Sequence, residues 1–429
     1  MTVISSSWFT ANPLVVKRES SYFDILLLSL TLLTVLFIPS IKINDGLFIG
    51  ADELLVTLMG VRLLQRGVFW LDKFLWVLIF LSCIILVSIL VNSNYKDYRE
   101  YLEIHKLIKI AILYMFTCWV TGQGIAKGTF VKMVLITFLG MVVFNILHLF
   151  NVYYFNEFIT ILYDTDGRDV MNFGKNSIGG PGPKRIVGTM GNPNINAILF
   201  LFYFAFFSFL QVEDQKEHSD WKVLSKRSIQ LLFLLSMLFI ILCQSRTGLA
   251  ALFVIYVFGV YLRRPNWKEV LLEISCVLGF FGISSFLDTV SLNYLSNTKP
   301  QLQENNSLAV RIKIWGELIG LWLQKPFFGY GPNKAFVYRT QLHPENEYVF
   351  YLWRYGIQGL LGFMALLTFP FLFLFKKIKD FSFVYFVLII VAIVALMNNP
   401  LANPKISVLF AMILGFSVAV FFNFKSKNE

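Results

Sequence analysis

The chain has few of the residues from which a soluble, disulfide-bonded or zinc-binding protein is built. Only 15% of its 429 residues are charged, whereas 57% are hydrophobic. A soluble domain of this length needs a larger charged fraction to cover its surface. The cysteines lie inside apolar runs and none belongs to a CxxC pair; they are Cys83, Cys118, Cys243 and Cys276. We therefore interpret them as packing residues and expect neither a disulfide framework nor a metal site.

Motifs for nucleotides and cofactors are also absent from the sequence. It contains no Walker A motif, no zinc-ligand pair and no glycine-rich dinucleotide motif, which disfavours an ATP-driven pump or a cofactor-dependent oxidoreductase. The formal net charge is +11, but most Lys and Arg residues lie in short gaps between apolar runs. A nucleic-acid partner needs basic residues clustered on a folded soluble surface. We expect no nucleic acid and no cofactor.

What the chain has in abundance is long apolar runs, to which Phe alone contributes 45 residues. A membrane-spanning helix needs about 20 mostly apolar residues. This rule predicts an all-α fold, a polytopic transmembrane bundle of about twelve helices, in a single integral membrane domain over residues 1–429. The predicted spans lie near 23–42, 47–61, 71–92, 104–121, 129–151, 192–211, 229–244, 247–262, 269–288, 347–375, 381–398 and 402–423.

The positions of Lys and Arg predict the orientation of these spans. Cytoplasmic loops carry an excess of positive residues, and every second gap here is basic, the two ends included. The basic gaps hold Lys17/Arg18, Arg62/Arg66/Lys73, Lys127/Lys132, Lys216/Lys222/Lys226/Arg227, Arg263/Arg264/Lys268, Lys376/Lys377/Lys379 and Lys425/Lys427. We expect a multi-pass protein of the bacterial inner membrane with both termini in the cytoplasm. The first span is expected to act as its own insertion signal, because no cleavage site precedes it.

The remaining gaps are predicted to face the periplasm, and two of them are long. Residues 152–191 form the first periplasmic loop, and residues 289–346 form the larger one. Within the larger loop, apolar residues at helical spacing over 312–323 predict an amphipathic helix at the membrane surface or under a periplasmic cap. The gap at 244–248 is too short to leave the membrane surface.

Four clusters of polar residues fall on this periplasmic side. Three are Lys184-Arg185 followed by Asn194, then Arg246, then Arg311. An arginine at a helix end often only extends toward the lipid head groups. Arginine also binds phosphate bidentately and keeps its charge at all relevant pH values, and charge beside apolar helices is usually functional. We therefore predict that these arginines bind phosphate.

The fourth cluster is His343-Pro344-Glu345-Asn346-Glu347-Tyr348, which opens the tenth predicted span. Here too a structural interpretation is available, since Asn346 can cap the helix and glutamates are favourable in its first turn. A Glu or His beside arginines can also take a proton from a hydroxyl. The whole set suits a lipid-linked pyrophosphate as donor and a sugar hydroxyl as acceptor, without a requirement for a metal ion.

These motifs resemble the O-antigen ligase/polymerase superfamily, which comprises membrane glycosyltransferases of the GT-C type. The family's His-Asn-x9-Gly-x2-Gly pattern is matched from Glu345-Asn346 through Gly356 and Gly359, with Glu in place of His. Its Arg-bearing segment is similar to Gln244–Gly248. Its "Arg, Trp, then Pro-x-x-Gly-x-Gly" block is similar to residues 310–331, and Arg185 with Gly191–Asn194 matches a fourth block.

The resemblance implies roles for these residues. Arg185, Arg246 and Arg311 would hold the pyrophosphate of an undecaprenyl-linked glycan. The catalytic set would comprise Glu345, His343 and Asn346, and further substrate contacts would be Lys184, Asn194 and Tyr348. Glu345 at the ligase His position favours a polymerase, although His343 could also act as the base.

Three functions remain open at this point. The preferred one is an O-antigen polymerase, which joins undecaprenyl-pyrophosphate-linked repeat units at the periplasmic face. The first alternative is an O-antigen ligase, which transfers the glycan to lipid A core. The second is a polysaccharide or lipid-glycan transporter, which would place charge near the middle of the membrane rather than at its outer rim. Expected partners are the lipid-linked glycan donor and acceptor, membrane lipids and a chain-length regulator protein.

Overall fold

The structure is a computed structural model that describes most of the chain. The described residues are 22–44, 47–68, 70–122, 127–163, 173–175, 177–178, 184–215, 221, 223–295, 307–340, 344–374 and 382–426. The α-helices are α1 Tyr22–Phe37, α2 Ala51–Arg66, α3 Lys73–Val91, α4 Leu102–Gly122, α5 Lys127–Phe150, α6 Phe155–Tyr163, α8 Pro193–Asp214, α9 Lys226–Leu242, α10 Arg246–Arg263, α11 Trp267–Leu295, α12 Ser307–Gln324, α13 Lys334–Thr340, α14 Glu347–Leu374, α15 Ser382–Val394 and α16 Pro404–Ser426. Two short strands, β1 Ile41–Asn44 and β2 Leu47–Ile49, pair antiparallel.

A helix lies on each of the twelve predicted spans, and the prediction of an all-α polytopic membrane protein is confirmed. Within the described residues, six helices are both long and apolar enough to cross a membrane: α3, α4, α5, α8, α10 and α11. The span that contains α4 is counted from Tyr98. The small β1–β2 hairpin was not predicted.

The second predicted span, near 47–61, is displaced toward higher numbers in the structure. Residues 47–49 belong to β2, and α2 begins only at Ala51. Asp52 and Glu53 occupy its first turn, where carboxylates are favourable against the helix dipole. Both form ion pairs with Lys109 of α4, whose Nζ lies 2.6 Å from Glu53 Oε1. These two carboxylates therefore tie α2 to α4.

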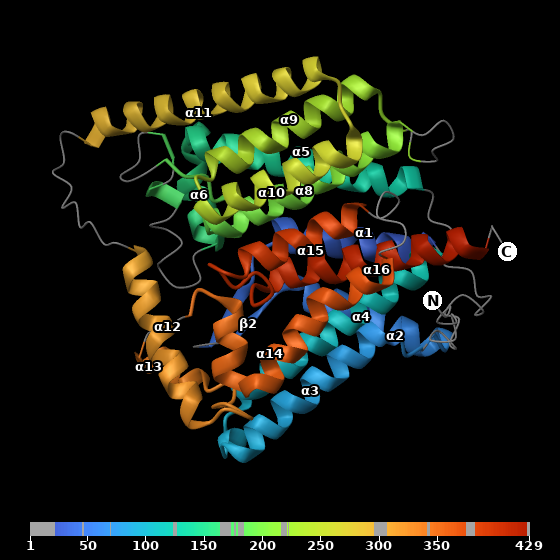
Figure 1. Ribbon diagram of the computed structural model, residues 1–429, viewed down its shortest axis with the longest axis vertical. Coiled ribbons are helices and arrows are strands. Elements are labelled where there is room, and N and C mark those ends of the chain that lie inside the picture. The colour runs from blue at the N-terminus through green and yellow to red at the C-terminus, as the bar shows by residue number, and fades with distance from the viewer. Residues whose placement is uncertain are drawn as a thin grey trace.

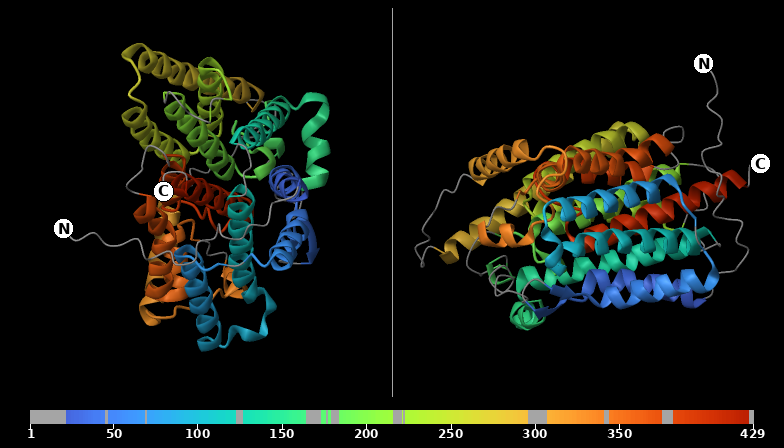
Figure 2. Two further views of the ribbon diagram at one scale, coloured as in Figure 1. Left: turned by 90° about the vertical axis from the view of Figure 1, so that its right-hand side faces the viewer. Right: turned by 90° about the horizontal axis from the view of Figure 1, so that it is seen from below.

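Helix α8 forms the centre of one half of the bundle. In the apolar stretch of α8 that is long enough to cross a membrane, 94% of the residues are buried inside the protein. Helix α8 packs against α9, α10 and α15. Its phenylalanine rings pack against neighbouring rings. The ring centre of Phe204 lies 4.6 Å from that of Phe233 of α9, and the ring centre of Phe206 lies 5.3 Å from that of Phe383 of α15. In the other half α16 packs along α4, and α14 along α3 (Figures 1 and 2). The tilted and edge-to-face pairs that the α8 phenylalanines form are favourable where no water competes.

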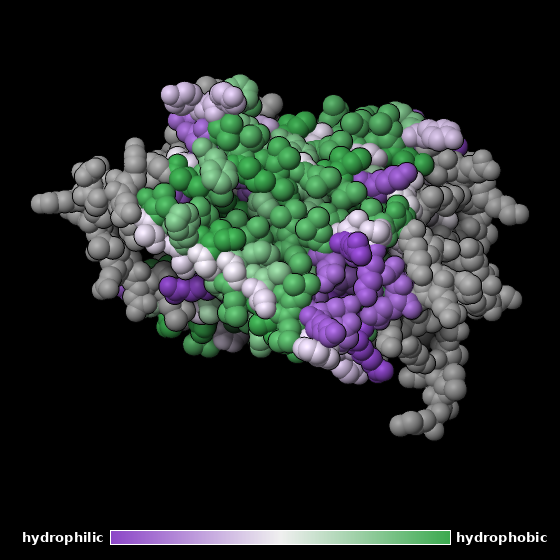
Figure 3. Space-filling view, turned by 90° about the horizontal axis from the view of Figure 1, so that it is seen from above, coloured by the Kyte–Doolittle hydropathy of each residue, from purple (hydrophilic) through white to green (hydrophobic). Residues whose placement is uncertain are grey.

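Helix α11 lies at the periphery of the bundle (Figure 1). Only 11% of the residues in its apolar stretch are buried inside the protein. Its exposed side chains include Leu271, Leu278 and Phe286. Figure 3 shows a broad band of apolar side chains across this face of the molecule. An exposed apolar patch of this extent is not stable in water and fits contact with lipid.

The two ends of the bundle differ. At one end lie the β1–β2 hairpin, α6, α12 and α13, on the left of Figure 1; we name this the site end. At the opposite end α2, α8 and α10 finish and α9 and α11 begin. The predicted amphipathic helix is α12, which packs against α14 through Leu318 and Trp353. The larger loop starts later than predicted, because α11 continues to Leu295.

Candidate active site

Four long helices, α8, α10, α14 and α16, begin at the site end, and each has a polar residue as its N-cap. The Asn192 side chain accepts hydrogen bonds from the backbone of α8, and Ser245 Oγ accepts one from Gly248 N of α10. Asn346 Oδ1 accepts one from Val349 N of α14, and Asn403 Oδ1 accepts one from Ile406 N of α16. Helix N-termini carry partial positive charge and free N–H groups, so they favour anions.

Contacts between loops bring these four helix starts together. Asn398 Nδ2 donates to Thr247 Oγ1 of α10 at 3.4 Å, and Asn399 Nδ2 donates to Pro344 O at 2.9 Å. Lys405 Nζ of α16 donates to Thr189 O at 2.9 Å, in the segment that leads into α8. Segments that are more than 200 residues apart in sequence therefore form one surface.

Arg185 lies in this surface, where two neighbours orient its guanidinium. Its Nε donates to Cys243 O at 3.1 Å, and its Nη2 donates to Asn194 Oδ1 at 3.0 Å. Burial lowers the pKa of Arg185, and the positive charges of Arg246 and Arg311 lower it further. Arg246 and Arg311 thus each lie close enough to Arg185 to lower its pKa, so the fold brings both of them toward Arg185.

Arg246 and Arg311 approach the site from α10 and α12. Arg246 is the first residue of α10 and is exposed, with no hydrogen bond or ion pair to any other described residue. Arg311 Nη1 donates to Met397 O at 3.3 Å, and its Nη2 forms an ion pair with Glu345 Oε2. The Glu345 side chain is 50% exposed, so the predicted base faces solvent at the edge of the arginine cluster.

Other predicted site residues have mainly structural contacts. Lys184 is buried and its Nζ donates to Ser177 O; desolvation lowers its pKa to about 8. Asn194 orients Arg185, Asn346 caps α14, and the Tyr348 hydroxyl donates to Ala392 O at 2.9 Å. Their predicted roles toward substrate stay predictions. His343 lies outside the described residues, and its role also stays a prediction.

The sequence-based prediction missed two parts of the site. One is the segment 395–405, which supplies the Met397 carbonyl, the side chains of Asn398 and Asn399, and Lys405. Its Asn-Pro pairs at Asn399-Pro400 and Asn403-Pro404 repeat the pattern of Asn192-Pro193 and could have indicated it. The other is Asp288 near the end of α11, whose carboxylate accepts from Gln244 Nε2 at 2.8 and 3.0 Å. A carboxylate inside a lipid-facing helix is an intramembrane signal that the prediction did not use.

The Pro326–Gly331 turn, which follows α12, forms hydrogen bonds with α14 through backbone groups. Helix α14 is interrupted at Gly356, and the freed Ile357 N donates to Pro326 O at 2.9 Å. Tyr330 N and Gly331 N donate to the carbonyls of Trp353 and Arg354, at 3.2 and 2.8 Å. A Cβ on Gly356 would lie 2.2 Å from Phe327 O, so the interruption requires glycine. Arg311 lies on α12 and Glu345 lies two residues before α14, so this contact helps to fix their relative positions.

The arrangement is therefore a surface of positive potential with carboxylates at its margin. Three guanidinium groups and four helix starts contribute the positive potential, and Glu345 and Asp288 contribute the carboxylates. Residues 231–364 match the family model for O-antigen ligase.

This part of the chain is similar to the O-antigen ligase family. The resemblance to the O-antigen ligase/polymerase superfamily is confirmed over this segment. It contains Arg246, Arg311, Glu345 and the turn that fastens α12 to α14, whereas Arg185 and the segment 395–405 lie outside it. The similarity supports ligase- or polymerase-type glycosyl transfer by a multi-pass membrane protein. No curated protein matches the chain.

Proposed function

We propose that the protein is an O-antigen polymerase, a metal-independent glycosyltransferase that joins undecaprenyl-pyrophosphate-linked repeat units. The observation that supports this most is the convergence of Arg185, Arg246 and Arg311 beside Glu345 at one end of the bundle. Pyrophosphate is a strong leaving group once its charge is offset, and bidentate guanidinium groups offset it well. The site end then faces the periplasm of the inner membrane, with both chain termini in the cytoplasm, in agreement with the basic gaps.

The reaction follows from these positions. The acceptor sugar hydroxyl attacks the anomeric carbon of the donor sugar, and its proton passes to the Glu345 carboxylate. The bond between that carbon and the pyrophosphate oxygen breaks, and undecaprenyl pyrophosphate leaves into the arginine cluster. Donor pyrophosphate competes with Glu345 for Arg311, so donor binding releases the carboxylate to act as a base.

The choice of polymerase rests on Glu345, which stands where the ligase pattern has His. The ligase is the second candidate, and the similarity to the O-antigen ligase family supports it as much as it supports the polymerase. A transporter is a weaker candidate, because the convergent charges lie at the end of the bundle rather than halfway along it.

One experiment separates the three functions. Purified protein is incubated with a short undecaprenyl-pyrophosphate-linked repeat unit, alone and together with lipid A core. A ladder of longer glycans from the first mixture supports the polymerase. Product only in the presence of core identifies a ligase, and bound but unconsumed glycan contradicts both enzymes.

A further inference from the structure

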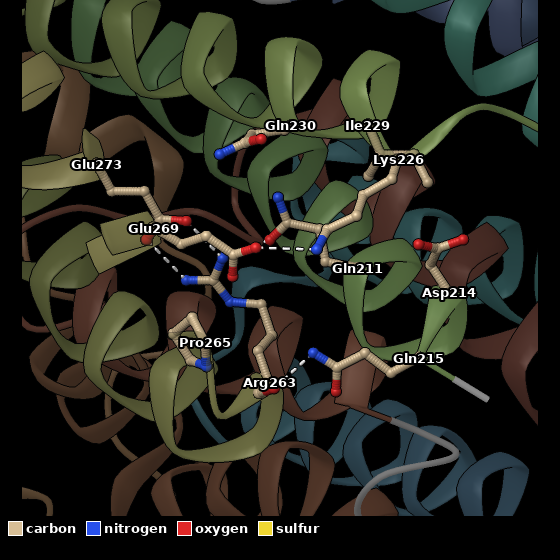
Figure 4. Close-up of a pocket in the computed structure, with 10 residues that line it drawn as sticks. All are labelled: Gln211, Asp214, Gln215, Lys226, Ile229, Gln230, Arg263, Pro265, Glu269 and Glu273. Carbon is tan, nitrogen blue, oxygen red and sulfur yellow. Dashed lines mark hydrogen bonds and ion pairs between the residues drawn. The ribbon is translucent and has the colours of Figure 1, made fainter. Parts of the chain in front are cut away.

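A polar cavity lies at the opposite end of the bundle from the arginine cluster, in a region that the proposed reaction does not use. It has a volume of about 200 Å³ and lies where α8 and α10 end and α9 and α11 begin. Its lining includes Asp214, Lys226, Gln230, Arg263 and Glu269 (Figure 4). Cavities for drug-sized ligands measure about 300–1,000 Å³, so this one suits a smaller polar group.

The cavity is built around Arg263, which is 4% exposed. Arg263 Nη1 and Nη2 pair with the buried Glu273 carboxylate at 2.8 and 3.1 Å, and Gln215 Nε2 donates to Arg263 O at 2.6 Å. Arg263 Nε, however, has no hydrogen-bond partner among the described residues. A buried donor on a charged group is rarely left unsatisfied, so Arg263 keeps one donor free for an acceptor oxygen.

The remaining groups of the lining call for a ligand that carries both charges. Lys226 Nζ lies 2.9 Å from Glu269 Oε1 near the mouth of the cavity (Figure 4). Asp214 has no ion pair with any described residue, which leaves its carboxylate available to a cation. An anionic oxygen beside Arg263 and Lys226 and an ammonium group beside Asp214 would satisfy the lining.

The surroundings place this cavity at the level of lipid head groups. Trp267, at the start of α11, is 67% exposed, and Lys268 Nζ lies 5.7 Å from the centre of its ring. Exposed tryptophan beside a basic residue is typical of the membrane–water interface. Leu271 and Ile274 follow on α11 and are 52% and 45% exposed, which offers acyl chains an apolar surface.

We propose that this cavity binds the phosphoethanolamine head group of a membrane phospholipid. The phosphodiester accepts hydrogen bonds from Arg263 Nε and Lys226, and the primary ammonium donates to Asp214. Phosphatidylcholine carries the same charges but has no N–H donor, and phosphatidylglycerol has no cation. The cavity therefore discriminates between head groups by hydrogen bonding rather than by net charge alone.

Native mass spectrometry of the purified full-length protein tests the proposal. Phosphatidylethanolamine, phosphatidylcholine and phosphatidylglycerol with identical acyl chains are titrated in turn. We expect phosphatidylethanolamine to bind about tenfold more tightly than the other two, the effect of one charge-assisted hydrogen bond. Equal binding of all three lipids would overturn the proposal, because it indicates a nonspecific lipid shell.

Variants locate the effect within the cavity. Asp214→Asn removes the ammonium partner and is expected to abolish the preference, and Lys226→Gln is expected to weaken it. Lys268→Gln changes a lysine at the same end that does not line the cavity and should leave the preference intact. If both Asp214→Asn and Lys226→Gln retain the full preference, the site lies elsewhere. The measurement needs no glycan substrate, so its outcome is independent of the proposed polymerase activity.

Discussion

The ion pair between Arg311 and Glu345 is the residue-scale feature on which the proposed reaction depends. Glu345 is half-exposed and pairs with Arg311, whereas the Asp288 carboxylate accepts hydrogen bonds from the Gln244 amide. Two carboxylates thus compete for the role of base, and the match to the family pattern favours Glu345.

Glu345→Gln is expected to lower polymer formation by about 10²–10⁴-fold, because the amide keeps the shape but cannot accept a proton. Asp288→Asn should have the smaller effect. Glu317→Gln is the matched control, since Glu317 is an exposed glutamate of α12 that lies about 1.7 turns from Arg311. Polymer length and protein level are measured in one strain. Loss of polymer in Asp288→Asn, with normal polymer in Glu345→Gln, would move the base to α11.

The arginines are expected to act through the planar fork of the guanidinium as well as through charge. Arg246→Lys and Arg311→Lys each remove bidentate phosphate contacts and should lower turnover by about 10–100-fold at unchanged protein level. Arg227→Lys, an exposed arginine at the opposite end, serves as the control and should have normal activity. Binding of a lipid-linked repeat unit by the variants should weaken in parallel. Full activity of Arg246→Lys would argue against bidentate binding there.

At the scale of elements, the glycines of the family-like motifs have a structural explanation. Gly356 has φ 69° and ψ −165°, a region that essentially only glycine occupies. Gly329 has φ 59°, and a Cβ there would lie 2.4 Å from Arg354 O. The sequence predicted these positions as motif members but gave no reason for them, because the docking of one turn on a distant helix break cannot be read from local pattern.

Gly356→Ala is therefore expected to lower the melting temperature and to reduce activity. The backbone conformation alone costs about 1–3 kcal/mol for a residue with a Cβ, and the close carbonyl adds to this. Gly316→Ala is the control, because Gly316 lies in the middle of α12, is exposed, and has open space where a Cβ would be added. It should leave stability unchanged or raise it by up to about 1 kcal/mol. Thermal unfolding in detergent that treats the two variants alike would contradict the docking role of Gly356.

At the scale of the whole molecule, the helix pattern could be predicted from the sequence and the assembly of the site only in part. Apolar runs of about 20 residues located twelve of the described helices, because membrane helices must satisfy their backbone internally. The charge pattern placed Arg185, Arg246 and Arg311 on one side. It could not predict that the 395–405 segment lies against them, since the partners of Asn398 and Lys405 are more than 150 residues away.

The orientation of the chain in the membrane decides whether the site end can take part in a periplasmic reaction. Basic gaps predict that Lys268 lies in the cytoplasm, whereas Glu157 of α6 lies at the site end and should face the periplasm. Both side chains are exposed. In a background with Cys83 and Cys276 replaced by serine, Glu157→Cys should react with a membrane-impermeant thiol reagent in cells whose outer membrane alone is permeable. Lys268→Cys should react only after the inner membrane is opened. Reaction of both from the same side would contradict the topology. Reversed reactivity would place the arginine cluster in the cytoplasm, where it could not meet a periplasmic lipid-linked glycan.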